Sequence, residues 1–317
     1  MTISMDTAVG IDLGGTNAKM YIHDEKIIDT EGNVLSHSDE TIILEILNNA
    51  LSPLTNIKTA GIALPCTMVP HAGDRKILNT VLKFSALTKE KHNGILNQMA
   101  KKWGEKLNIE NVLILNDGEA AAIDVYFNPN IPKKYKNIMV VTLGTSIGVG
   151  FIFGGQPYIG PYPSRASHII LDPEGDWCLN ENHRGCWKTL AGIDFRKKLA
   201  LNMGLKNPKD ENLAMDTREI ADLAEKGFKK AKLYFKYYAE NVARGIATII
   251  SAVPVECVVI AGGVANAGDV LMEPLKERLQ QGDLLDPDLA PLIEFINVPD
   301  FSVAHGAQIY AFNKLVK

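Results

Sequence analysis

Two short segments of the chain share one design, in which an apolar strand runs into a turn of glycine and hydroxyl residues. They are AVGIDLGGT at residues 8–16 and IMVVTLGTS at residues 138–146. Glycines in such a turn permit positive φ and close backbone approach, so consecutive N–H groups can bind an anion. Although the two segments are too diverged to prove a duplication, they favour two related folds that face each other.

The length of the chain supports the same division. At roughly 150 residues per domain, the 317 residues predict two domains. The polar, proline-containing stretch FNPNIPKKYKN, residues 127–137, has the composition of a junction between the two halves. We therefore predict a first domain over residues 1–130 and a second over residues 131–302.

Apolar runs rich in Val and Ile alternate with segments of helical period, which is typical of an α/β protein. Strands are predicted over residues 7–12, 19–23, 59–63, 112–115, 138–142, 148–153 and 255–261. Helices are predicted over residues 40–51, 92–107, 118–126, 216–253 with an internal break, and 270–280.

Composition and charge exclude several classes of protein. Hydrophobic residues make up 46% of the chain and charged residues 22%, which excludes disordered, fibrous and disulfide-scaffold proteins. The formal net charge is −4 and no dense basic block is present, so nucleic acid is not an expected partner. The start lacks a secretion signal, and the most apolar tract, residues 246–261, is interrupted by Ser251, Pro254 and Glu256. We expect a cytoplasmic protein that does not enter a membrane.

The two glycine turns are candidate phosphate sites. Asp12 ends a predicted strand, and Gly14, Gly15, Thr16 and Asn17 follow it. Taken alone, this turn is equally compatible with an ordinary hairpin. A second turn with a hydroxyl at its tip, residues 144–146, follows the strand of the second half. Two matched turns favour phosphate binding.

Two further segments carry chemistry. Asp117 lies at the end of an apolar strand and the start of an Ala-rich helix, where open α/β sheets place ligand-facing carboxylates, although Asp is also a good helix N-cap. Gly262 and Gly263 end another strand, where backbone can lie against a flat ring such as adenine or simply form a βα loop.

These four elements, in this order and spacing, resemble the superfold of actin, the sugar kinases and the heat-shock ATPases, and within it the ROK family of sugar kinases and repressors. The resemblance spans nearly the whole chain. It implies two ribonuclease-H-like α/β domains with an ATP cleft between them, and a C-terminal helix, about residues 303–317, that returns to the first domain. It also implies a glucokinase-like, ATP-dependent enzyme that phosphorylates a hydroxyl of a sugar or sugar derivative.

The resemblance assigns roles to individual residues. Asp117 is the expected catalytic base, Asn116 orients the acceptor, and Asp12 binds Mg²⁺ through water. The remaining motif residues bind ATP. They are Gly14, Gly15, Thr16 and Asn17 in the first phosphate turn, Gly144, Thr145 and Ser146 in the second, and Gly262 and Gly263 at the adenosine.

The chain departs from the family at the sugar-binding motif. ROK kinases usually show Glu-x-Gly-His, nine residues, and then Cys-x-Cys-Gly-x-x-Gly-Cys-x-Glu, with both glutamates accepting hydrogen bonds from the sugar. Here Arg165 and Lys188 occupy the glutamate positions. Because Arg and Lys only donate hydrogen bonds, plain glucose bound in the usual manner is not expected. An acceptor with an anionic group is favoured, unless the loop has refolded and both side chains are solvated.

The same region holds a candidate zinc site. His168 and Cys178 keep the nine-residue gap, Asn180 replaces the middle cysteine, and Cys186 is displaced by one residue. With His183 between them, the order H-x9-C-x4-H-x2-C offers four tetrahedral ligands. The resemblance also places His168 at the sugar. Either a structural zinc or a decayed site fits this pattern.

Three functions compete at this point. Retention of Asp12, Asn116 and Asp117 favours a kinase over a non-catalytic ligand-binding or regulatory protein. The segment from His168 to Cys186 disfavours a chaperone-like or actin-like module. Repressor members carry an N-terminal helix-turn-helix, for which a first strand at about Thr7 leaves no room. The expected partners are a small-molecule carbohydrate and a second copy of the chain in a homodimer. An aromatic row at residues 234–238 serves either helix packing or the dimer face.

Overall fold

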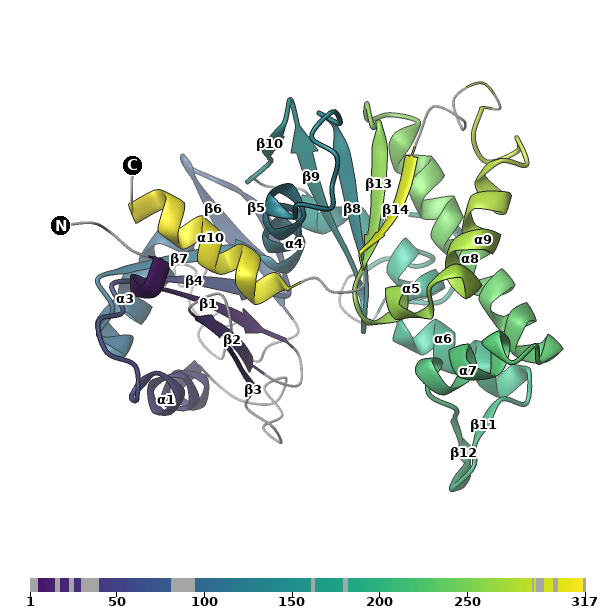
Figure 1. Cartoon of the computed structure of the whole chain (residues 1–317), viewed down its shortest axis with the longest axis horizontal. Coiled ribbons are helices and arrows are strands. Elements are labelled where there is room, and N and C mark those ends of the chain that lie inside the picture. The colour runs from purple at the N-terminus through teal and green to yellow at the C-terminus, as the bar shows by residue number, and fades with distance from the viewer. Residues whose placement is uncertain are drawn as a thin grey trace. The chain divides into compact units, whose positions relative to one another are not determined.

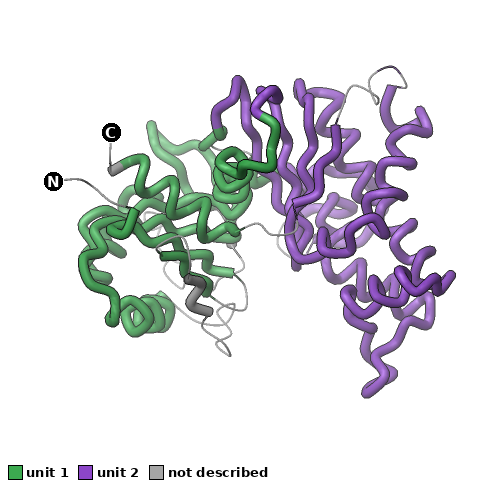
Figure 2. Tube along the Cα trace, viewed as in Figure 1, with its two compact units in different colours: residues 1–132, 157–165, 302–317 green, residues 133–156, 166–301 purple. Residues whose placement is uncertain are grey.

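The computed structural model describes residues 5–14, 18–22, 26–29, 40–80, 95–160, 163–178, 182–286, 288, 294–298 and 302–315. The chain forms two compact units (Figure 2). Unit 1 comprises Met1–Pro132, Pro157–Arg165 and Ser302–Lys317, and unit 2 comprises Lys133–Gln156 and Ala166–Phe301.

Unit 1 is built on a five-stranded sheet of order β3-β2-β1-β4-β7 (Figure 1). Its strands are β1 (Ala8–Leu13), β2 (Ala18–Ile22), β3 (Lys26–Asp29), β4 (Thr59–Leu64) and β7 (Asn111–Asn116). β2 runs antiparallel to both β1 and β3, whereas β1, β4 and β7 run parallel. The unit also contains a hairpin, β5 (Cys66–His71) with β6 (Asp74–Thr80), and helices α1 (Glu40–Leu51), α3 (Leu96–Leu107), α4 (Asp117–Phe127) and α10 (Val303–Leu315).

Unit 2 repeats the same sheet plan in the order β10-β9-β8-β13-β14. Its strands are β8 (Ile138–Leu143), β9 (Ile147–Phe153), β10 (Gln156–Pro157), β13 (Cys257–Ala261) and β14 (Glu294–Val298). As in unit 1, the central strand has an antiparallel neighbour on one side and a parallel ladder on the other. The repeated strand-and-turn segments are therefore the matching central strands β1 and β8, which confirms the prediction of two related α/β folds.

Helices cover the sheet of unit 2. They are α5 (Trp187–Ala191), α6 (Ile193–Asn202), α7 (Thr217–Glu225), α8 (Lys229–Ile250) and α9 (Asp269–Leu279), with a small hairpin of β11 (Lys206–Asn207) and β12 (Asp210–Ala214). The break predicted within residues 216–253 lies at Gly227, whose φ is +88°. Of the aromatic row on α8, Tyr234, Phe235 and Tyr238 are buried in the core and Tyr237 is 51% exposed. Helix packing therefore accounts for three of the four rings.

Helix α10 lies directly against the backbone of its neighbours in unit 1. A Cβ atom on Gly10 or Gly61 would overlap the carbonyl oxygen of Ala304 or Ala307, and one on Gly306 would overlap that of Ala120. Glycine at these three positions lets the helix approach β1, β4 and α4 at backbone distance. The side-chain amide of Gln308 then donates to the Ala8 carbonyl at 3.0 Å.

The structure corrects some expectations. Residues 157–165 belong to unit 1, not to the second domain, because the Gly160 N–H donates to Glu119 Oε1 at 2.8 Å and the Met68 N–H donates to Ser164 Oγ at 3.0 Å. Helix α3 begins at Leu96, and residues 92–94 lie outside the described residues. Sequence patterns missed the hairpins, β3, β14, α5 and α6. Within the described ranges, every helix is too short or too polar to cross a bilayer.

The contact between α10 and the sheet generates a stability prediction. We expect Gly61→Ala to lower the free energy of unfolding by about 1–3 kcal/mol, because its Cβ must displace the Ala307 carbonyl. Urea unfolding followed by circular dichroism measures this change. Gly263→Ala is the control, since a Cβ there meets nothing within 4 Å. Equal stability of the two variants would contradict the proposed constraint.

Candidate functional site

Two carboxyl groups lie at the same edge of the unit 1 sheet. Asp12 is near the end of β1, and Asp117 directly follows β7; the parallel ladder pairs Asp12 with Ala63 and Leu64 with Asn116. Carboxyl ends of parallel strands meet at one edge, where ligands of open α/β sheets bind. Burial, reinforced by the charge of Asp117 and opposed by Lys19, raises the pKa of Asp12 to about 7. Burial also raises the pKa of Asp117 to about 6, against the lowering effect of the Gly118 N–H.

The residue before the candidate base, Asn116, is the N-cap of α4. Its Oδ1 accepts from the Gly118 N–H at 2.8 Å, and its Nδ2 donates to the Cys66 carbonyl at 2.7 Å. Glu119 completes a capping box by accepting from the Asn116 N–H at 2.9 Å. The cap expected of Asp117 is thus provided by Asn116, whose side chain is buried and held by the backbone. Its role toward an acceptor stays a prediction.

A buried ion pair adjoins this helix start. Arg75, on β6, donates through Nη1 to both oxygens of Glu119 at 2.7 and 2.8 Å and through Nη2 to the Ile114 carbonyl at 3.2 Å. Glu119 is 1% exposed and also accepts from the Gly160 N–H. One carboxylate therefore joins α4, β7, the β5–β6 hairpin and residues 157–165. The Asn-x-x-Glu capping pattern was readable in the sequence, but nothing in it identified Arg75.

Of the two predicted phosphate turns, the structure describes the second one fully and the first one only in part. Gly14 is half-buried after β1, and Gly15, Thr16 and Asn17 lie outside the described residues. In unit 2, the turn between β8 and β9 is closed by the Gly144 N–H, which donates to the Ser146 carbonyl at 3.0 Å. The start of α6 fixes this turn, because the Ile193 N–H donates to the Thr145 carbonyl at 2.9 Å.

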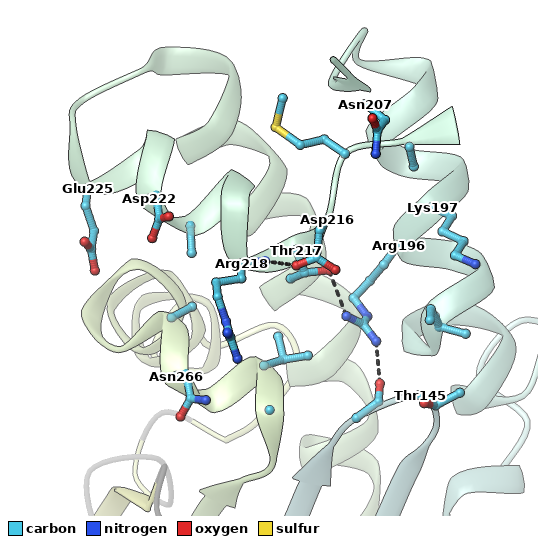
Figure 3. Close-up of a pocket in the computed structure, with 18 residues that line it drawn as sticks. Thr145, Arg196, Lys197, Asn207, Asp216, Thr217, Arg218, Asp222, Glu225 and Asn266 are labelled. Carbon is cyan, nitrogen blue, oxygen red and sulfur yellow. Dashed lines mark hydrogen bonds between the residues drawn. The ribbon is translucent and has the colours of Figure 1, made fainter. Parts of the chain in front are cut away.

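A cavity of about 630 Å³ in unit 2 brings two of the predicted nucleotide motifs together (Figure 3). Gly144, Thr145 and Gly263 all line it. The two glycines of the adenosine motif differ in role. Gly262 has a φ of +93°, and a Cβ there would press on the Leu143 backbone, whereas the space beside Gly263 is open. Gly262 thus packs β13 against β8, and Gly263 keeps the cavity wall flat.

The four candidate zinc ligands converge in unit 2. The ligand atoms of His168, Cys178, His183 and Cys186 lie within 4.8 Å of one another. The two sulfurs are 3.7 and 3.9 Å from His168 Nδ1. Tetrahedral zinc separates a nitrogen and a sulfur ligand by roughly 3.6 Å. His183 Nε2 is buried without a hydrogen-bond partner in the described structure, and burial raises the pKa of the Cys186 thiol. These donors fit a zinc ion.

The two basic residues at the family's glutamate positions lie in different units. Arg165 is half-buried in the 3₁₀ segment Pro163–His168, at the end of the unit 1 stretch, and Lys188 is half-buried in α5 of unit 2. Their roles toward an acceptor stay predictions.

Comparison with known proteins gives consistent similarities. The glucokinase of Thermotoga maritima is 26% identical over 310 residues, covering 92% of each chain. An N-acetylmannosamine kinase of Escherichia coli is 28% identical over 269 residues, covering 82% of this chain and 84% of that one. The crystal structure of a ROK family glucokinase from Streptomyces griseus in complex with glucose and AMPPNP shares the fold, with a TM-score of 0.70, 19% identity and coverage of 96% and 99%.

The model of the ROK family matches this chain over residues 8–311, which include both sheets and the larger part of α10. Together with the fold and the motif positions described above, this match shows that the chain belongs to the ROK family.

Proposed function

We propose that the chain is an ATP- and Mg²⁺-dependent kinase that phosphorylates a hydroxyl of a sugar or sugar derivative. The observation that carries the proposal is the pair of half-buried carboxyl groups with raised pKa values, Asp12 and Asp117, at the ligand edge of the unit 1 sheet. Relatives named glucokinase and N-acetylmannosamine kinase support it. A non-catalytic binding protein, the competing function, has no need of a carboxylate placed as a base.

Asp117 accepts the proton of the acceptor hydroxyl while the hydroxyl oxygen attacks the γ-phosphorus of ATP. The new O–P bond forms as the bond from the γ-phosphorus to the ADP oxygen breaks, and ADP leaves. Asp12 would hold Mg²⁺ through water, and oxygen donors of this kind suit that ion. Mg²⁺ would neutralise charge on the phosphates. In unit 2, the N–H groups of Thr145 and Ser146 would hold phosphates, and the wall at Gly263 would hold adenine.

The zinc proposal concerns structure and not catalysis. His168, Cys178, His183 and Cys186 provide four ligands, which fill a tetrahedral shell and leave no open position. The ion would brace residues 168–186, where the Cys178 N–H already donates to the His183 carbonyl at 2.9 Å. We also propose, from the sequence, a cytoplasmic location and a homodimer.

The base assignment is tested by Asp117→Asn. We expect turnover to fall roughly 10²- to 10⁴-fold while ATP affinity stays within about twofold, because only the proton acceptor is lost. A coupled assay with ATP and a panel of sugars, amino sugars, sugar acids and polyols measures turnover. Glu40→Gln, which removes a charge from α1 in the same unit, serves as the control.

Wild-type turnover should also decline as the pH falls through about 6. The pKa of Asp117 is raised to about that value, so the base becomes protonated below it and can no longer accept a proton. Full activity of Asp117→Asn on its best acceptor would show that the base is another group. A wild-type protein that uses no acceptor in the panel would contradict the kinase proposal.

The acceptor class is tested by two substitutions at the family's glutamate positions. If Arg165 and Lys188 bind an anionic group, acids or phosphorylated sugars should be better acceptors than neutral hexoses. Each change to Ala should then raise KM for the anionic acceptor by about tenfold and leave KM for ATP unchanged. Lys198→Ala is the control, because Lys198 lies on α6 and forms an exposed ion pair with Asp176. Efficient use of neutral sugars with KM unchanged in both variants would exclude the anionic pocket.

The metal proposal is tested by elemental analysis of protein purified without chelator. We expect about one zinc per chain in the wild type and none in Cys178→Ser, because three ligands bind zinc far more weakly than four. Cys257→Ser is the matched control, as Cys257 is a buried cysteine on β13 outside the cluster. Wild-type protein without zinc would refute the site.

A further inference from the structure

A buried cation without a carboxylate partner lines the cavity of unit 2. Arg196, on α6, is only 6% exposed. Its Nη1 donates to Thr217 Oγ1 at 2.9 Å, its Nη2 donates to the Gly144 carbonyl, and its Nε is buried without a partner in the described structure. Among the described residues, no carboxylate lies within ion-pairing distance of this guanidinium. Charged side chains are almost never buried unless they are paired.

The surroundings of Arg196 do not supply the missing charge. Asp216 precedes Thr217, but its carboxylate accepts from the Arg218 N–H at 2.8 Å as the N-cap of α7. The Tyr238 ring centroid lies 5.8 Å from the guanidinium carbon, but this ring carries no negative charge. In Figure 3 the side chain runs from α6 to the end of β8 and the start of α7, at the cavity. The cavity is therefore where a counter-ion can lie.

We propose that the guanidinium of Arg196 binds the phosphate chain of the nucleotide, which provides its counter-ion in the cavity. The inference rests on the proposed function, which places ATP in this cavity. Arg196 bonds to the carbonyl of Gly144, the first residue of the second phosphate turn. It therefore fixes the shape of that turn and brings positive charge to it.

The chemistry of the side chain favours a phosphate. A guanidinium has five N–H donors in a fixed fork that matches phosphate oxygens, and two of its donor atoms are engaged here. Lys197 and Arg218 also line the cavity, but they are exposed, so water and salt screen their charges. Arg196 is buried, and its attraction for an anion is screened much less. The three cations therefore differ in their expected effect on binding.

The experiment compares ATP with adenosine, which has the same base and ribose but no phosphate. Dissociation constants of both are measured by calorimetry for the wild type, Arg196→Met and Lys198→Met. We expect Arg196→Met to weaken ATP binding about 10- to 100-fold and adenosine binding less than threefold. Lys198→Met, the control on an exposed cation of the same helix that does not line the cavity, should change ATP binding less than threefold.

The outcomes separate this inference from the proposed function. Suppose that the wild type binds ATP. If Arg196→Met then weakens the binding of ATP and of adenosine by the same factor, or weakens the binding of neither, Arg196 does not bind the phosphates and the inference is wrong. If the wild type does not bind ATP, the nucleotide site itself is wrong. Circular dichroism checks folding. Should Arg196→Met unfold, Arg196→Lys keeps the charge without the fork, and it must retain the preference for ATP over adenosine; loss of that preference would overturn the inference.

Discussion

The parallel pairing of β1, β4 and β7 is the constraint on which the candidate active site depends. Asp12 and Asp117 are 105 positions apart in the sequence, and the register of two strand pairs brings both to one edge of one sheet. A slip of one residue in either pair would turn each side chain of the slipped strand to the other face. Helix α10 holds these strands from one side, because Gly10 and Gly61 allow its backbone to contact the sheet.

Much of this fold follows from patterns of short range. Apolar runs bounded by glycine turns gave the central strands within one or two residues, and helical period gave α1, α9 and the break before α8. The hairpin β5–β6 was not predicted, because Pro70 and the polar run at Asp74–Lys76 interrupt its alternation of apolar and polar residues. Residues 157–165 were assigned to the wrong domain because a hydrogen bond to Glu119, far away in sequence, decides their place.

The candidate site divides in the same way. Glycine turns and the acid after β7 are local signals, and so is the spacing that predicted the cluster of His168, Cys178, His183 and Cys186. The difference between Gly262 and Gly263 is not local, since it depends on whether the Leu143 backbone faces the missing Cβ. The role of Arg196 could not be predicted from the sequence either, because an arginine followed by Lys197 and Lys198 looks like a surface residue until its burial is known.

The ion pair of Arg75 and Glu119 limits how this protein can evolve. Both side chains are largely buried, so losing either one first leaves an unpaired charge beside the candidate base. Such intermediates are destabilised, and the two positions are therefore expected to change together or not at all. Among close homologues of this chain, an acid at position 119 should accompany a base at position 75, and a neutral residue at one position should accompany a neutral residue at the other. The β5–β6 hairpin and the start of α4 would then be inherited as one unit.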